Sequence, residues 1–145
     1  MDQVQAVFFD IGETLATPHF SPAGRLASLE PLPGVSEALD WMRNLLRLGI
    51  ISNTGAETFE SMRLALAGAG LYSFLSEDLL IYSSEVGMKK DSPVIFRLAC
   101  QRTGLEAAPE RCLFVGEDAD ERAFAAQAGM RVAASVAAAA KALTA

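Results

Sequence analysis

The stretch Val7-Phe8-Phe9-Asp10-Ile11-Gly12-Glu13-Thr14-Leu15 carries an apolar run that stops abruptly at a carboxylate. Residues 4–9 have the length and the apolar composition of a buried strand. Asp10 ends this run, and a glycine follows two residues later. The position of this charged residue raises the question of what Asp10 contacts at the end of the strand.

Apolar runs alternate with helical patterns along the chain, which is typical of a parallel sheet covered by helices on both faces. The runs are residues 4–9, 49–52, 79–82, 112–115 and 130–134. Helices are predicted from Pro33-Gly34 to a stop at Gly49, over 55–67, from Ser92-Pro93 to Gly104, over 118–128, and after a cap at Ser135. The sequence thus predicts an α/β fold with five short parallel strands and crossovers on both sides.

Length, charge and cysteine content limit the function classes. The 145 residues fit one domain, residues 1–145, and a formal net charge of −6 disfavours binding to nucleic acids and anionic membranes. Cys100 and Cys112 lie in apolar stretches without CxxC spacing, so both are predicted to be buried free thiols. Residues 1–3 carry no basic start, and no run approaches the ~20 apolar residues of a membrane span. A cytoplasmic protein is expected.

Polar residues follow four of the predicted strands. In an open parallel sheet the carboxyl ends of the strands meet at one rim, where ligands bind. One residue alone is explained equally well as a helix cap or a solvated side chain, but coincidence at four strand ends points to function. The residues are Asp10, then Ser52-Asn53-Thr54, then Glu85 to Lys90, and finally Gly116-Glu117-Asp118.

Four segments in this order resemble the motifs of the haloacid dehalogenase superfamily of phosphohydrolases and relatives. The segments are VFFDIGETL, GIISNTG, EVGMKKDSPVIF and CLFVGEDADERAFAAQAGM, and together they span almost the whole chain. The resemblance implies a Rossmann-like three-layer α/β/α sandwich around the five-stranded parallel sheet. It also places the family lysine at Lys90 rather than Lys89.

The resemblance further implies a Mg²⁺-dependent phosphohydrolase that works through an aspartyl-phosphate on Asp10. A carboxylate can act as a nucleophile when it is held in line with a phosphorus atom whose oxygens are neutralised. Ser52 and the Asn53 backbone N–H would hold the phosphoryl oxygens, and Lys90 would neutralise charge. The Mg²⁺ ligands would be Asp10, the Gly12 carbonyl, and the acids Glu117 and Asp118. The expected partner is a phosphorylated substrate of unknown size.

Gly12 departs from the family pattern, because most phosphatases of the family carry there an aspartate that protonates the leaving alcohol. Losing a general acid costs about 10² to 10⁴-fold in rate. Gly12 therefore leaves three interpretations open. The chain is a slow or specialised phosphatase, a hydrolase of the dehalogenase or phosphonatase type, or a catalytically weak or inactive protein that binds phosphate and metal.

Two residues near Gly12 could supply a proton instead. Glu13 is adjacent, although it stands at a tight turn where the family has glycine, and His19 lies in the following segment. A flap histidine without a catalytic role is the preferred interpretation of His19.

Glu117 is a second departure from the family pattern, because aspartate is usual there. The longer glutamate side chain moves the carboxylate oxygens, and Mg²⁺ tolerates little distortion of its octahedral coordination. Asp118 is the replacement favoured by the sequence, with a helix N-terminal charge as the equal alternative. Glu121, one helical turn from Glu117, is a lesser candidate.

The spacing of the motifs predicts that no cap domain is inserted. Asp10 to Ser52 and Ser52 to Lys90 are each about forty residues and are filled by predicted helices, a strand and a flap of about residues 14–31. A site open to solvent suits a bulky or macromolecular substrate. The alternative is a homodimer in which a second copy supplies the cap.

Overall fold

The computed structural model describes residues 4–144, so the predictions that concern residues 1–3 and Ala145 lie outside the described part. The strands are β1 (Ala6–Phe9), β2 (Ala16–Phe20), β3 (Leu26–Pro31), β4 (Arg47–Ser52), β5 (Leu80–Tyr82), β6 (Cys112–Val115) and β7 (Arg131–Ala133). The α-helices are α1 (Val35–Arg43), α2 (Phe59–Gly68), α3 (Ser83–Val86), α4 (Val94–Arg102), α5 (Ala119–Gln127) and α6 (Val136–Leu143). Short 3₁₀ turns cover Tyr72–Phe74, Glu77–Leu79 and Pro109–Arg111.

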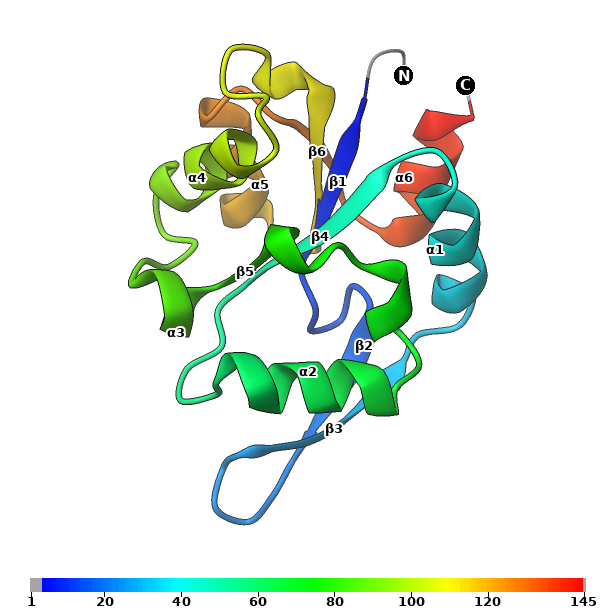
Figure 1. Cartoon of the computed structure of the whole chain (residues 1–145), viewed down its shortest axis with the longest axis vertical. Helices are drawn as coiled ribbons and strands as arrows, with labels where there is room; N and C mark the ends of the chain where they lie inside the picture. The colour runs from blue at the N-terminus through cyan, green and yellow to red at the C-terminus, as the bar shows by residue number, and fades with distance from the viewer. Residues whose placement is uncertain (1–3, 145) are drawn as a thin grey trace.

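Five strands form a parallel sheet in the order β5-β4-β1-β6-β7, which confirms the predicted α/β architecture. The strand that ends at Asp10 is therefore central, with β4 and β6 on its two sides. Helices α1 and α6 lie on one side of the sheet and α4 and α5 on the other (Figure 1). The order reverses direction on either side of β1, and ligands of such sheets bind at this point.

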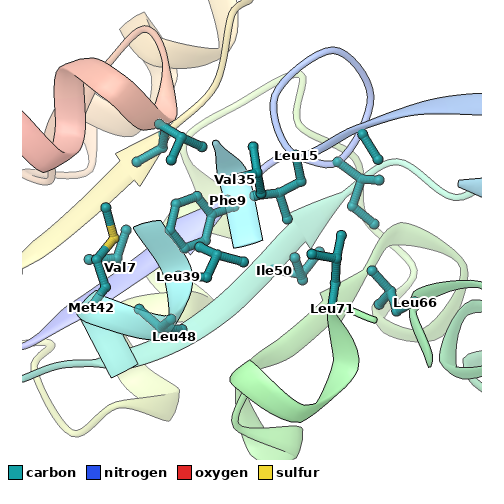
Figure 2. Packing of buried hydrophobic residues seen from close by; sticks show 14 of the residues in the cluster. Val7, Phe9, Leu15, Val35, Leu39, Met42, Leu48, Ile50, Leu66 and Leu71 are labelled. Carbon is teal, nitrogen blue, oxygen red and sulfur yellow. The ribbon is translucent and has the colours of Figure 1, made fainter. Parts of the chain in front are cut away.

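Alternate residues of the central strands pack into two separate hydrophobic cores, one on each face of the sheet. Val7, Phe9 and Ile50 pack with Leu39 and Met42 of α1, as Figure 2 shows. On the opposite face, the residues packed together are Phe8, Phe114, Ile95, Phe96 and Ala99. Apolar strands buried on both faces explain why the sequence shows continuous apolar runs rather than alternation.

Two predicted helix boundaries were wrong for identifiable reasons. The first helix ends at Arg43, and Gly49 lies inside β4 instead of stopping the helix. A Cβ on Gly49 would come within 2.9 Å of the Phe8 ring and 2.7 Å of the Leu79 Cβ atom, so glycine is there for close packing. The second helix begins at Phe59, because the Thr58 side chain accepts a hydrogen bond from the Ser61 backbone N–H and caps it.

A two-stranded antiparallel hairpin, β2–β3, occupies the segment predicted as a flap. It extends from the carboxyl ends of the parallel strands and runs beside α2 (Figure 1). The first described residues of the chain and the end of α6 lie at the opposite end of the molecule (Figure 1).

Both cysteines are buried free thiols, as predicted. Over residues 4–144, the structure contains no helix that is long and apolar enough to span a membrane.

Candidate active site

Asp10 is held at the carboxyl end of β1 by its neighbours on both sides. Its backbone N–H donates to the Val115 carbonyl at 2.9 Å, and its Oδ1 atom accepts a hydrogen bond from the Ile11 backbone N–H at 2.8 Å. A Cβ on Gly116 would lie 3.5 Å from the Asp10 Cβ atom and 2.9 Å from the Phe114 ring. Glycine at 116 therefore lets the loop after β6 pass directly beside the carboxylate.

Lys90 reaches the same point from the loop before α4. Its Nζ atom lies 2.8 Å from Asp10 Oδ1 and 2.8 Å from Glu121 Oε1, and its side chain is 2% exposed. Lys89, by contrast, is exposed. The Asn53 Oδ1 atom accepts a hydrogen bond from the Lys90 backbone N–H at 3.0 Å. The loop after β4 thereby fixes the position of the lysine.

Ser52 is buried at the end of β4 and lines the same cavity as Asp10 and Lys90. The loop beyond it is tied to the end of β5. The Thr54 backbone N–H donates to Ser83 Oγ at 2.9 Å, and the Thr54 and Ser84 hydroxyls lie 2.7 Å apart. The sequence analysis did not anticipate this tie, although the Ser83-Ser84 pair directly after a predicted strand is a visible signal.

Of the acidic residues that follow β6, Glu117 and Asp118 face solvent, whereas Glu121 lines the cavity. Glu117 and Asp118 are exposed, and neither lines the cavity. Asp118 Oδ1 accepts a hydrogen bond from the Glu121 backbone N–H and caps α5, which was the structural alternative for this residue. Arg122 donates from Nη1 to the Gly116 and Glu117 carbonyls and so fixes the backbone of this loop.

Glu121 is the acid that enters the cavity, although the sequence ranked it below Glu117 and Asp118. Its side chain is 19% exposed, and its Oε1 atom is buried without a hydrogen bond of good geometry despite its closeness to Lys90. Burial raises the pKa of Glu121 above its usual value, and the nearby Lys90 ammonium opposes this shift. The helical spacing from Glu117 was the signal for this position.

The donors around the cavity fit a hard divalent cation. Among the described residues, no three His, Cys, Asp or Glu side chains gather in the manner of a metal cage. Mg²⁺ does not need one, since it is usually held by one or two carboxylates together with waters and substrate phosphate. The Asp10 carboxylate, the Gly12 carbonyl and the Glu121 carboxylate are oxygen donors of this kind at the cavity.

Both candidate proton donors lie on the exposed surface of the molecule. Glu13 is exposed and adopts a left-handed backbone with φ of 58°, the conformation that glycine takes more easily. His19 is exposed on the hairpin, with its Nε2 atom 3.8 Å from Glu30 Oε2. Neither residue lines the cavity. Gly12 itself lines it and contributes no acidic side chain.

The cavity has a volume of about 260 Å³ and lies between the ends of the central strands, the hairpin and α2. One salt bridge joins the hairpin to the start of α2. Arg25 Nε donates to Glu57 Oε2 at 2.9 Å, and the same oxygen accepts from the Leu26 backbone N–H at 3.1 Å. Ser61 Oγ donates to Glu57 Oε1 at 2.9 Å. We call Arg25, Leu26, Glu57 and Ser61 the hairpin latch.

The latch holds a carboxylate in its charged form. The hydrogen bond from Arg25, followed by that from Leu26, lowers the pKa of Glu57 to about 2, although burial acts in the opposite direction. The ion pair between Arg25 and Glu57 thus ties the hairpin to the start of α2.

Comparison with known proteins agrees with this arrangement. A family model of haloacid dehalogenase-like hydrolases matches residues 23–129, which is most of the chain but begins after Asp10. Pyrimidine 5'-nucleotidase YjjG of Escherichia coli strain K12 is 36% identical over 90 residues. These residues are 62% of this chain and 37% of the relative, so the chain spans only about a third of the length of that protein.

Solved structures share the fold along nearly the whole chain. A HAD-superfamily hydrolase from Ehrlichia chaffeensis superposes with a TM-score of 0.75 and 17% identity, covering 99% of this chain and 98% of the other. A subfamily IA hydrolase from Geobacter sulfurreducens gives a TM-score of 0.70 and 19% identity, with coverage of 89% and 88%. At these identities the likeness concerns the fold.

Proposed function

Since the chain belongs to the haloacid dehalogenase-like hydrolase family, we propose that it is a Mg²⁺-dependent phosphohydrolase that works through an aspartyl-phosphate on Asp10. One observation carries this proposal. A buried ammonium, Lys90 Nζ, lies 2.8 Å from the Asp10 carboxylate beside a cavity that Ser52 and Glu121 also line. A carboxylate with a cation in contact and a hydroxyl beside the same cavity is suited to binding and attacking a phosphoryl group.

Each residue has a defined task in this proposal. An Asp10 oxygen attacks phosphorus, while the Ser52 hydroxyl and the Asn53 backbone N–H donate to phosphoryl oxygens. Lys90 neutralises charge on the nucleophile and on the transferring group. Mg²⁺ held by Asp10, the Gly12 carbonyl and Glu121 would screen the approach of two anions. Glu117 and Asp118 stay sequence-based candidates for the metal, reached only if the loop after β6 rearranges.

The test compares wild type with Asp10→Asn in the presence of Mg²⁺ and of a chelator, with Asp40→Asn on the exposed side of α1 as the matched control. Substrates are a panel of phosphomonoesters together with a 2-haloacid. We expect phosphate release from wild type and Asp40→Asn that requires Mg²⁺ and falls at least about 10³-fold in Asp10→Asn. Acid-quenched protein should carry one phosphoryl group on the peptide that contains Asp10.

Three outcomes would contradict the proposal. Phosphate release that persists in Asp10→Asn would place the nucleophile elsewhere. Binding of beryllofluoride with Mg²⁺ but no turnover of any phosphomonoester would indicate a binding protein. Halide release from the 2-haloacid without phosphate release would indicate a dehalogenase.

A further inference from the structure

The residues that line the cavity beside Asp10 differ in character between the elements that supply them. The strand ends, the loops and α5 supply polar lining residues that include Asp10, Ser52, Lys90 and Glu121. The hairpin and α2 supply apolar ones, with Glu57 just before α2. The apolar residues are Pro18, Phe20, Leu26, Leu29 and Met62, which we call the apolar wall. A phosphoryl group bound next to Asp10 and Lys90 would leave the wall to contact the group that carries the phosphate.

The wall offers nothing to a charged leaving group. Among the described residues that line the cavity, Lys90 is the single cation, and it already contacts Asp10 and Glu121. Glu57 also lines the cavity, but its carboxylate is already paired with Arg25 in the hairpin latch. A second phosphate or a carboxylate on the substrate would lie against apolar surface without a partner, which is unfavourable.

Flat aromatic groups suit this wall. Phe20 can stack against a ring, and the Met62 thioether makes favourable contacts with aromatic edges. The latch fixes the wall, since the Leu26 backbone N–H is bonded to Glu57 while the Leu26 side chain lines the cavity. The wall is therefore a preformed surface rather than a loose loop.

Gly12 restricts the leaving group in a second, independent way. Gly12 contributes no acidic side chain, and neither Glu13 nor His19 lines the cavity, so none of these three residues protonates the leaving oxygen. A phenol has a pKa near 10, whereas an alkanol resembles water with a pKa of about 16. Phenolate is consequently a far better leaving group than alkoxide when nothing protonates it.

We propose that the substrate of this site is an aryl phosphate with an uncharged aromatic leaving group, an inference that rests on the function proposed above. An Asp10 oxygen forms a bond to phosphorus, the bond from phosphorus to the phenolic oxygen breaks, and the electron pair leaves on that oxygen. The phenolate takes its proton from solvent. Water then hydrolyses the aspartyl-phosphate, which releases inorganic phosphate and restores Asp10.

The first test measures kcat/KM for substituted phenyl phosphates, 1-naphthyl phosphate, a phosphotyrosyl peptide, and alkyl phosphates with and without a carboxylate. We expect aryl substrates to exceed alkyl ones by at least about 10²-fold, with kcat/KM rising steeply as the pKa of the phenol falls. Activity on the peptide would identify a protein-borne source of the aryl group. Activity confined to free aryl phosphates would identify a small-molecule source.

The second test restores an acid with Gly12→Asp, and Gly12→Asn is its matched control. A Cβ at position 12 would meet nothing within 4 Å, so both side chains have room. The ratio of alkyl to aryl kcat/KM should rise about 10²-fold in Gly12→Asp and not in Gly12→Asn. The dependence on the pKa of the phenol should also become shallower in Gly12→Asp.

The third test changes the wall at Phe20, which is 62% exposed and hence tolerant of substitution. Phe20→Ala should lower kcat/KM for 1-naphthyl phosphate about 10-fold. Leu64→Ala, an exposed apolar residue of α2 outside the cavity lining, should have no effect. Phe20→Arg should shift preference from phenyl phosphate to 4-carboxyphenyl phosphate.

Failure of this inference is distinguishable from failure of the proposed function. Equal turnover of aryl and alkyl phosphates, or a preference for carboxylate-bearing substrates, would overturn the aryl assignment and leave the phosphohydrolase intact. No phosphate release from any substrate would overturn both. An unchanged alkyl to aryl ratio in folded Gly12→Asp would show that leaving-group protonation is not what limits the reaction.

Discussion

Lys90 is buried between two carboxylates, and this makes it structural as well as chemical. Its ammonium lies 2.8 Å from one oxygen of Asp10 and 2.8 Å from one of Glu121. Removing one member of a buried charge cluster leaves the others uncompensated, which costs far more than the cluster itself contributes. The same residue that would neutralise a phosphoryl group therefore also keeps two acids together in the folded chain.

Lys90→Met should lower the free energy of unfolding by about 3–5 kcal/mol in chelator at pH 7. The loss should shrink as pH falls, because burial raises the pKa of Glu121 and protonation removes its uncompensated charge. Added Mg²⁺ should restore part of the stability by taking the place of the cation. Urea denaturation measures all three effects. Lys89→Met, at the exposed neighbouring position, should stay within about 0.5 kcal/mol of wild type. Equal stability of the two variants would refute this account.

The sequence located the site residues whose position follows from strand ends alone. Asp10 and Ser52 line one cavity because parallel strands deliver their carboxyl ends to one rim, whereas the choice of Lys90, which lines the same cavity, came from the family resemblance. It could not decide among Glu117, Asp118 and Glu121. That choice depends on Asp118 capping α5, which turns Glu121 inward one helical turn later. The role of each residue in chemistry stays a prediction.

The hairpin illustrates what the sequence could not show at the scale of an element. The flap was located, but its two strands were not predicted. Pro18 and Pro31 lower the strand propensity of β2 and β3, and the pairing shifts register between His19 and Phe20. What stabilises these strands is remote in sequence, since Arg25 and Glu57 are 32 residues apart.

Glu57→Gln should loosen the hairpin in a pH-dependent manner. A carboxyl whose pKa falls from 4.5 to about 2 on folding stabilises the folded state above pH 4.5, and this contribution is lost as pH falls toward 2. We expect the variant to be about 1 kcal/mol less stable than wild type at pH 6. This difference in the free energy of unfolding should narrow below pH 4. Thermal denaturation across this range is the measurement.

Glu60→Gln is the control for the latch, because Glu60 pairs with Arg63 on the exposed side of the same helix. Its effect should be much smaller than that of Glu57→Gln. A stability difference between Glu57→Gln and wild type that stays constant from pH 6 to pH 3 would contradict this account. It would mean that the charged form of Glu57 does not hold the hairpin in place. Hydrogen exchange of the β2–β3 amides should accelerate only in Glu57→Gln.

At the scale of the whole molecule, the sheet separates two hydrophobic cores. Gly49 marks a close approach within one of them, where β4 passes the 3₁₀ turn at Glu77–Leu79. The sequence predicted the sheet and its five strands because buried parallel strands are continuous apolar runs. It misjudged Gly49 because glycine both ends helices and admits close packing, and only tertiary contacts distinguish the two uses.

Gly49→Ala should destabilise the protein by about 1–3 kcal/mol, since the new methyl group would meet Leu79 and the Phe8 ring. The midpoint of thermal unfolding should fall by several degrees, about 2–8 °C for each kcal/mol. Gly68→Ala in α2 has open space around the new methyl group and should be neutral or stabilising by up to about 1 kcal/mol. A neutral Gly49→Ala would mean that β4 and the turn can separate at little cost.

The hairpin and the two ends of the described chain occupy opposite poles of the molecule. An affinity handle, a fluorescent protein or a solid support joined near either end would therefore project from the pole opposite the hairpin. An immobilised form should admit large and small solutes as freely as the protein in solution does, so an array of tethered molecules can be screened directly against bulky phosphorylated compounds.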